Sequence, residues 1–413
     1  MKQDFSKWID SLPTPKGVLE KCQRKGREFL GEKGLPNQSL EEWRLTNLNR
    51  FKDIFNLPIA NIKILKEEND NKLFPEEIEE TPRIVIDPSI NHASIQNLPS
   101  GVSTLNDDEL SNVLNIANSR LNSHEDWCLS INEASTNKIL GLKVKKSSRV
   151  NLEIIIQSTI ETFNSSRILI VIEEDAHLDL LQVIKSQDKS AISNLIQIIM
   201  NKDSEINHGF LGLGENSSSL LTQVFIDQAE HSKYYFTSVL NGWSISRLEP
   251  RIFQREGKAE TRLKGLQCSN NDAQLATHSL VQFNGPEGTL DQFQKSIAAD
   301  KSHCIFNGAV QVPREAQKTN ASQLSRNLLI SNKARIDTKP ELEIVADDVK
   351  CAHGATVSQL LEEELFYLRS RGITIKQATS LLLRGYCQEI LDALPDSAQK
   401  WNVLNQIIKG LNK

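Results

Sequence analysis

Hydrophobic and polar positions change their spacing along the chain, and the changes divide it into parts. In the first 55 residues, apolar side chains recur at i, i+3, i+4 and i+7, beginning with Phe5 and Trp8, which predicts helices. Ser39 precedes Glu42 by three residues, the spacing of a capping box, and this predicts a helix start there. Residues 1–55 are therefore expected to form an N-terminal helical domain.

Residues 56–125 form a polar connecting region with few periodic positions. One short apolar run at 83–87 predicts a strand, and residues 107–121 have helical spacing. A mixed connecting region is therefore expected between the N-terminal helices and the rest of the chain.

From residue 126 to 357 the apolar positions gather in short β-prone runs between Asn, Asp, Ser and Gly turns, and almost no helix is expected. The runs at 328–330, 334–336 and 342–345 recur every seven or eight residues. Strands of three or four residues at this spacing suit a solenoid whose coils each contribute one strand per face. The sequence therefore favours a β-helix core over 126–357, with a β-sandwich or barrel as the alternative.

Helical spacing returns after Val357. The expected apolar stripes are Leu361, Leu365 and Leu368 in a first helix, Ala378, Leu382, Tyr386 and Ile390 in a second, and Trp401, Leu404 and Ile408 in a third. Residues 358–413 are therefore expected to form a C-terminal helical domain. Helices at both ends would cover strand edges that a solenoid leaves unpaired.

Composition narrows the class of protein. The chain of 413 residues is 38% hydrophobic and 24% charged, which is typical of a globular protein. It has no apolar run of the roughly 18 residues needed to span a bilayer and no secretory or transit pattern at its start, so we expect a cytoplasmic protein with no membrane partner. A net charge of −5 without a Lys/Arg cluster argues against a nucleic-acid partner.

The clearest candidate for chemistry is the stretch "DDVKCAHGATV", which places Cys351 and His353 two residues apart. Side chains at i and i+2 of a strand share a face, so both could ligate a metal, although two ligands are too few to hold one alone. The alternative is a buried cysteine and a hydrogen-bonded histidine placed there by coincidence. The sequence has no phosphate-binding loop and no C-x-x-C pair, so neither ATP hydrolysis nor a zinc ribbon is expected.

Residues 316–373 resemble one family closely, the SufB/SufD scaffold proteins of iron–sulfur cluster assembly. Shorter stretches support the resemblance: "LPNQSLEEWRLTNL", "WCLSINEAS" and "HCIFNGAVQV". The resemblance implies a mainly β fold with α, a right-handed parallel β-helix between helical ends, and a scaffold of the SUF system that is not an enzyme. Leu324, Ala352 and Gly354 stand where SufB carries a cysteine and two glutamates, which favours the SufD branch.

The same resemblance implies partners and a site. A SufB-like paralogue would pair with this chain along the β-helices, and a transient iron–sulfur cluster would be built at the shared interface. His353 matches the SufD histidine that faces this interface. Cys351 matches less firmly, and a purely structural role for it is an equal alternative. The C-terminal helices would dock a SufC-like ABC-type ATPase. The resemblance also leaves room for a reduced flavin in the complex, and for a homodimer when the chain is expressed alone.

Two other classes of function remain open from the residues. A β-helical carbohydrate-active enzyme would need carboxylates and aromatic side chains clustered on one face, yet only 6% of the residues are aromatic. A metalloprotein that holds its metal alone is disfavoured by the scattered cysteines.

Overall fold

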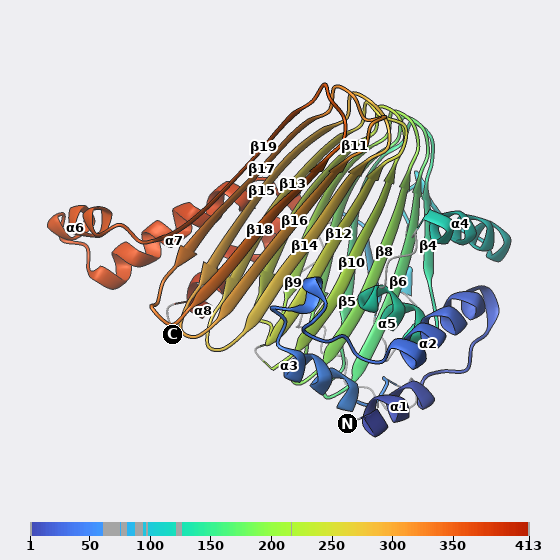
Figure 1. Cartoon of the computed structure of the whole chain (residues 1–413), viewed down its shortest axis with the longest axis horizontal. Helices are drawn as coiled ribbons and strands as arrows, with labels where there is room; N and C mark the ends of the chain where they lie inside the picture. Colours follow the sequence, from blue (N-terminus) through green and yellow to red (C-terminus); the bar gives the residue numbers. More distant parts are fainter. Residues whose placement is uncertain are drawn as a thin grey trace.

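The β-prone runs of the middle of the chain assemble into a parallel solenoid. The computed structural model describes residues 2–60, 75, 81–86, 94–95, 98–120, 126–215 and 217–411. Its strands form about eight coils, with helices at both ends (Figure 1). The prediction of a β-helix with helical ends is confirmed, and the alternative of a sandwich or barrel is wrong, because the coil strands pair in parallel with the strand one coil away.

Two sheets face each other across the solenoid interior. Sheet A contains β3 (Val102–Thr104), β4 (Leu140–Val144), β6 (Phe163–Ile172), β8 (Ala191–Met200), β10 (Ser219–Gln228), β12 (Ile245–Gln254), β14 (Gln274–Phe283), β16 (His303–Val312) and β18 (Arg335–Ile344). Sheet B contains β1 (Arg83–Ile86), β2 (Ser94–Ile95), β5 (Arg149–Gln157), β7 (His177–Lys185), β9 (Glu205–Leu213), β11 (Lys233–Asn241), β13 (Glu260–Ser269), β15 (Thr289–Ala298), β17 (Asn320–Leu329) and β19 (Lys350–Gln359).

Equivalent residues of successive coils stack directly on one another, at first 28 positions apart. Alternate side chains point inward and form the main apolar cluster, which includes Leu152, Ile196 and Leu248. The strands β17 and β18 each have ten residues rather than the expected three or four. The runs at 334–336 and 342–345, which were expected to be two strands, belong to one strand, β18, because the polar residues between them join the same parallel ladder.

The helices lie against the outer faces of the two sheets and beyond the end of the solenoid. They are α1 (Lys2–Asp10), α2 (Glu20–Lys33), α3 (Leu48–Asp53), α4 (Asp107–Arg120), α5 (Trp127–Ser135), α6 (Glu362–Ser370), α7 (Ile375–Leu391) and α8 (Val403–Leu411), with short 3-10 helices that include η2 (Glu41–Trp43) and η5 (Asp396–Trp401). Among the described residues, no helix is long and apolar enough to cross a membrane.

Each group of terminal helices covers a different sheet. The N-terminal helices share an apolar cluster with the outer face of sheet A, where the Trp8 ring packs against the Phe163 ring with their centres 5.1 Å apart. The helices α7 and α8 share another with the outer face of sheet B, where Ile407 packs with Leu211. In contrast, α6 and the start of α7 project beyond the last coil, at the left of Figure 1.

Four local predictions are wrong. The expected third C-terminal helix is two elements, because Asn402 has a φ of 48° and separates η5, which contains Trp401, from α8. Trp127–Ser135, in a range where only strands were expected, is the helix α5, and all nine of its residues are buried. Ser39 does not cap a helix, because its backbone N–H and its hydroxyl both donate to Asn37 Oδ1. In α7 the buried stripe includes Leu383 and Cys387 in place of the expected Leu382 and Tyr386, which are half-buried.

Buried charges fix the N-terminal helices to the solenoid. On the outer face of sheet A, Arg247 donates to Glu249 and to the backbone carbonyl of Glu42, and its guanidinium lies 4.2 Å from the centre of the Trp43 ring. Burial by itself favours the neutral acid, but the charges of Arg247 and Arg251 outweigh it and lower the pKa of Glu249 to about 2. The pair is therefore ionised in the folded chain.

A second buried carboxylate fixes the far end of the chain to the first coil. Glu153 is fully buried in β5 and accepts hydrogen bonds from Lys400 and Trp401 at 2.8 Å each, and from Arg83 at 2.7 Å. Because a buried carboxylate without partners is costly, these contacts hold η5 against the start of the solenoid.

Candidate functional site

The solenoid ends in a coil whose strands have one neighbour each. In the described part of the chain, β18 pairs only with β16 and β19 only with β17, so each keeps a free edge. The inward-facing side chains of these two strands have no further coil above them. We call the free edges and inward residues of β18 and β19 the open end. Unpaired parallel strands of this kind are ready to bind another chain.

The structure places Cys351 and His353 together at the open end, on the inward side of β19. In the parallel register Cys351 stands opposite Ala321, and His353 stands opposite Gln323, both of which are buried in the interior of β17. Cys351 packs against the apolar interior, whereas His353 is exposed. The predicted shared face is therefore present, and the exposure of His353 results from its place in the last coil.

The two side chains differ in their readiness to ligate a metal. Partial burial raises the pKa of the Cys351 thiol, and a backbone hydrogen bond at Ala321 opposes this only in part. A thiol must lose its proton to bind a metal, so Cys351 is the weaker donor in the isolated chain. The imidazole of His353 is accessible from solvent. Among the described residues, no group of three or more His, Cys, Asp or Glu side chains could hold a metal ion.

The three residues that depart from the SufB pattern lie around His353. Ala352 and Gly354 flank it in β19, and Leu324 stands opposite Gly354 in β17. A Cβ added to Gly354 would lie 3.4 Å from Leu324 Cδ1, so the two positions are in contact range. The surroundings of His353 therefore offer no thiolate or carboxylate at these positions, and further ligands for a metal would have to come from another chain.

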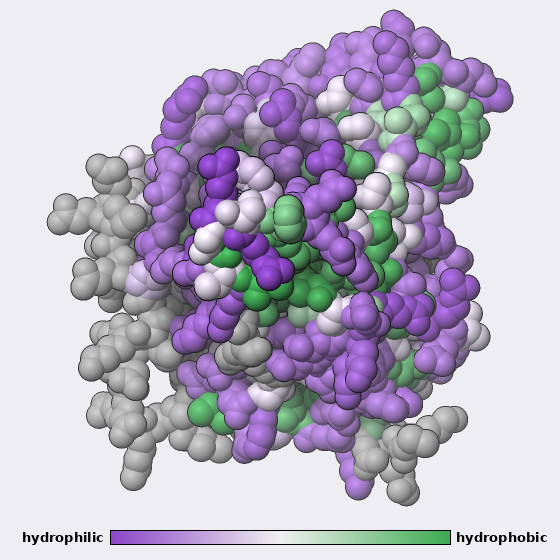
Figure 2. All heavy atoms as spheres, turned by 90° about the vertical axis from the view of Figure 1, so that its left-hand side faces the viewer, coloured by the Kyte–Doolittle hydropathy of each residue, from purple (hydrophilic) through white to green (hydrophobic). Residues whose placement is uncertain are grey.

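A second candidate surface is the part of the chain that projects beyond the open end. The helix α6 has no buried residue, and Phe366 and Tyr367 are 71% and 58% exposed. Ile375 and Leu381 of α7 are also more than half exposed. Figure 2 turns this side of the molecule to the viewer and shows apolar patches within a mostly hydrophilic surface. Clustered apolar exposure of this kind marks a binding surface.

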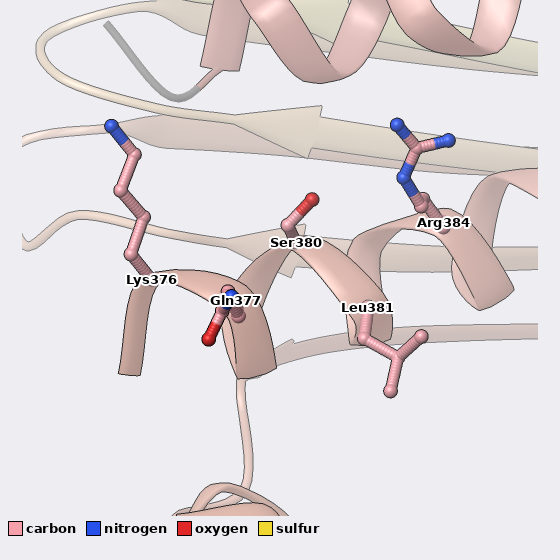
Figure 3. A pocket seen from close by; sticks show the side chains of 5 residues that line it. All are labelled: Lys376, Gln377, Ser380, Leu381 and Arg384. Atoms are coloured by element: carbon pink, nitrogen blue, oxygen red, sulfur yellow. The ribbon is translucent and has the colours of Figure 1, made fainter. Parts of the chain in front are cut away.

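One face of α7 adds charge to this surface. Lys376, Ser380 and Arg384 follow one another at helical spacing and point to the same side, while Leu381 points away from them (Figure 3). Together with Gln377 they line a shallow, open hollow. Arg384 also donates to Asn405 Oδ1 at 2.8 Å, which holds it toward α8. The projecting segment therefore combines exposed apolar side chains with the cations Lys376 and Arg384 on one face of α7.

The other half of α7 is firmly attached to the coils next to the open end. Lys295 of β15, which is nearly fully buried, donates to the backbone carbonyl of Tyr386 at 2.7 Å and pairs with Glu389 at 2.6 Å. The Tyr386 hydroxyl donates to the backbone carbonyl of Arg326 in β17 at 2.6 Å. These anchoring residues could not be predicted from the sequence, because a lone lysine inside a strand and a tyrosine inside a helix carry no motif. Only the position of Tyr386 on the predicted apolar stripe indicated contact with the core.

Comparison with known proteins agrees with this architecture. The family model described as SUF system FeS cluster assembly, SufBD core domain, matches residues 154–386, which is more than half of the chain. An iron–sulfur cluster assembly SufBD family protein of Synechocystis is 44% identical over 164 residues, which cover 40% of this chain and 36% of that protein. Iron–sulfur cluster assembly protein SufD of Escherichia coli is 38% identical over 155 residues, 37% of each chain. The chloroplastic protein ABCI7 of Arabidopsis thaliana is 36% identical over 181 residues, 44% of this chain and 38% of that one. Each match thus spans little more than a third of the relative's length.

Proposed function

Because this chain belongs to the SufBD core family of SUF iron–sulfur cluster assembly proteins, and is SufD-like within it, we propose that it acts as a non-catalytic scaffold subunit on which a nascent cluster is built. The observation that carries the proposal is the open end, where an exposed histidine and a half-buried cysteine lie on the inward side of β19, a strand with one free edge. Two donors without a third are half of a metal site. A second chain that brings thiolate and carboxylate ligands would complete it.

The partner at the open end is proposed to be a SufB-like paralogue. A second β-helix can pair its own free strands with β18 and β19 and cover the exposed inward residues at the same time. Imidazole and thiolate both bind iron, and a cluster held by ligands from two chains can be released when the chains move apart. In this arrangement the cluster is cargo, His353 is the principal donor from this chain, and Cys351 is the secondary one.

The second partner is proposed to be a SufC-like ABC-type ATPase that docks on α6 and the first half of α7. The exposed apolar residues of these helices can enter a groove on the ATPase, and the cations on α7 can meet acidic groups at its rim. Because Lys295 and Tyr386 tie α7 to β15 and β17, movement of the docked ATPase would reach the coils beside His353.

Docking is tested with a double variant of α6. Phe366→Glu with Tyr367→Glu is expected to weaken capture of the purified ATPase by more than about thirtyfold, because buried aromatic side chains at an interface each contribute about 2 kcal/mol or more. Ile160→Glu is the matched control, since Ile160 is equally exposed but follows β5, far along the chain from α6. Titration by surface plasmon resonance measures both.

Equal affinity in the α6 variant and the Ile160 control would place the ATPase elsewhere on the chain. Point variants are preferable to removal of residues 358–413, because that deletion would also expose the apolar outer face of sheet B and leave Glu153 without Lys400 and Trp401. A loss of capture after deletion would therefore not distinguish docking from unfolding.

A further inference from the structure

The interior of the solenoid changes character toward the open end. The row of stacked inward residues that ends at His353 consists of Leu152, Leu180, His208, Phe236, Leu263, Gln292 and Gln323. The early members are mostly apolar, and the two members before His353 are glutamines. Both glutamines are buried, with 3–4% of their surface exposed, so their amide groups need partners inside the protein.

These two glutamines form a directed chain of hydrogen bonds toward His353. Gln292 Nε2 donates to Ser279 Oγ at 2.7 Å, and Gln323 Nε2 donates to Gln292 Oε1 at 2.8 Å. Each amide nitrogen thus donates to a residue earlier in the chain, and the Gln292 amide oxygen accepts from the glutamine of the next coil. The last oxygen, Gln323 Oε1, is buried and has no hydrogen-bond partner among the described residues. A buried acceptor without a donor is costly, and the next member of the row is His353.

The geometry of the ladder allows this last contact. Gln292 and Gln323 stand opposite each other in the register and are hydrogen-bonded, and Gln323 and His353 stand opposite each other in the same way. Neighbouring strands are about 4.8 Å apart, so a rotation of the side chains suffices. A bond between a glutamine oxygen and a histidine nitrogen already exists deeper inside, where Gln182 Oε1 lies 3.2 Å from His208 Nε2.

The facing sheet leaves space for the Gln323 amide. Gly308 lies on β16, and a Cβ added to it would collide with Gln323 Nε2. The absence of a side chain at Gly308 therefore permits the orientation in which Gln323 Nε2 bonds Gln292 and Gln323 Oε1 remains available to the last coil. Gly308, Gln292 and Gln323 come from three different strands and together set the orientation of the Gln323 amide.

We propose that Gln323 is a positioning residue for His353: its Oε1 accepts the N–H of one ring nitrogen and leaves the other nitrogen free to bind iron at the open end. A hydrogen bond to one nitrogen of a ligating histidine fixes the tautomer and the ring orientation. This inference rests on the proposed function of His353 as a ligand. It adds that the orientation of the ligand is set from inside the solenoid.

The test compares two substitutions in the complete complex with the SufB-like and SufC-like partners. Gln323→Leu removes the acceptor and is expected to lower the bound iron and sulfide about tenfold or more, the range seen when such an outer partner of a metal ligand is lost. Gln323→Glu keeps an acceptor for the imidazole and is expected to retain most of the cluster. If Gln323 only fills space, the order is reversed, because the apolar leucine suits the interior and the glutamate charge does not.

Two further variants complete the test. Gly308→Ala displaces the amide and is expected to reproduce the loss in Gln323→Leu, whereas Gln294→Leu, an equally buried glutamine on β15 outside this row, is expected to load normally. Normal loading in Gln323→Leu, or equal loss in Gln294→Leu, would overturn the inference while leaving the role of His353 intact. Normal loading in His353→Ala, measured in parallel, would overturn both the proposed function of His353 and the inference.

Discussion

His353→Ala is expected to leave the complex with the SufB-like and SufC-like partners assembled and to remove most of its cluster. The alanine takes away the accessible donor of this chain, while the interface still rests on the strands β18 and β19 and their other side chains. The measurement is subunit stoichiometry together with iron and sulfide content on the same preparation. We expect full stoichiometry with cluster content reduced at least tenfold.

Two controls define what this result means. His177→Ala removes a partly exposed histidine from β7 and is expected to change neither quantity. Of the two substitutions at the open end, Cys351→Ser is expected to have the milder effect, because partial burial raises the pKa of the Cys351 thiol and its apolar contacts account for its position. An intact His353→Ala complex with normal cluster loading would contradict the proposed role of this histidine. A loss of cluster in proportion to lost complex would show that His353 only packs at the interface.

Arg247→Met is expected to destabilise the attachment of the N-terminal helices by about 3 kcal/mol, because it leaves the buried carboxylate of Glu249 with one cation, Arg251, at 3.4 Å. The substitution also removes the hydrogen bond to Glu42 and the contact with Trp43. Hydrogen exchange at the amides of η2 and α5 measures this free energy locally, which is preferable in a solenoid whose parts need not unfold together.

The matched control is Arg262→Met. The Arg262 side chain is 55% exposed and pairs with Glu260 on sheet B, so its loss is expected to cost less than about 1 kcal/mol. Replacing both members of the buried pair, Arg247→Met with Glu249→Leu, should recover much of the loss, since no charge is then left unpaired. Equal protection of η2 and α5 in Arg247→Met and in the unchanged chain would show that Arg247 does not hold the N-terminal helices to sheet A.

The contribution of the Arg247–Glu249 pair to the stability of the fold depends on pH. The pKa of Glu249 is about 2 in the folded chain, below the value of about 4.3 in an unfolded one. A depressed acid pKa stabilises the fold above the unfolded value, and this contribution is lost as the pH falls through the folded one. The difference between Arg247→Met and the unchanged chain should therefore be largest above about pH 4.5 and shrink toward pH 2.

The turn-separated β-prone runs favoured a solenoid over a sandwich or barrel, but the expected spacing of seven or eight residues was wrong, because the runs 334–336 and 342–345 lie in one strand and the first coils repeat every 28 residues. The alternation of side chains along each strand follows from backbone geometry alone. The same alternation placed Cys351 and His353 on one face. It could not predict that His353 is exposed, since an inward residue is normally covered by the next coil. That exposure depends on β19 being the last strand of sheet B, which is a property of the whole fold.

The failures in local prediction have a common physical source. Trp127–Ser135 is buried on all sides, so it lacks the polar face by which a helix is recognised in sequence. Ser39 and Glu42 have capping-box spacing, but the Ser39 hydroxyl donates its hydrogen bond to Asn37 instead. Thr374 and Gln377, in contrast, form a capping box at the start of α7. The role of Gln323 could not be predicted, because an isolated polar residue shows its hydrogen-bond partners only when the strands one coil away are placed beside it.

The two ends of the solenoid also differ in the direction of their strands. At the end opposite β19, the strands β2 and β3 run antiparallel to their neighbours, so the parallel ladder does not continue there. Among the described residues, only the end formed by β18 and β19 thus offers parallel strands with free edges for end-to-end growth. Two chains that join through their open ends, whether identical or paralogous, use up both growing surfaces, and polymerisation stops at a pair. A solenoid with two equivalent ends would instead add copies head to tail and form fibres.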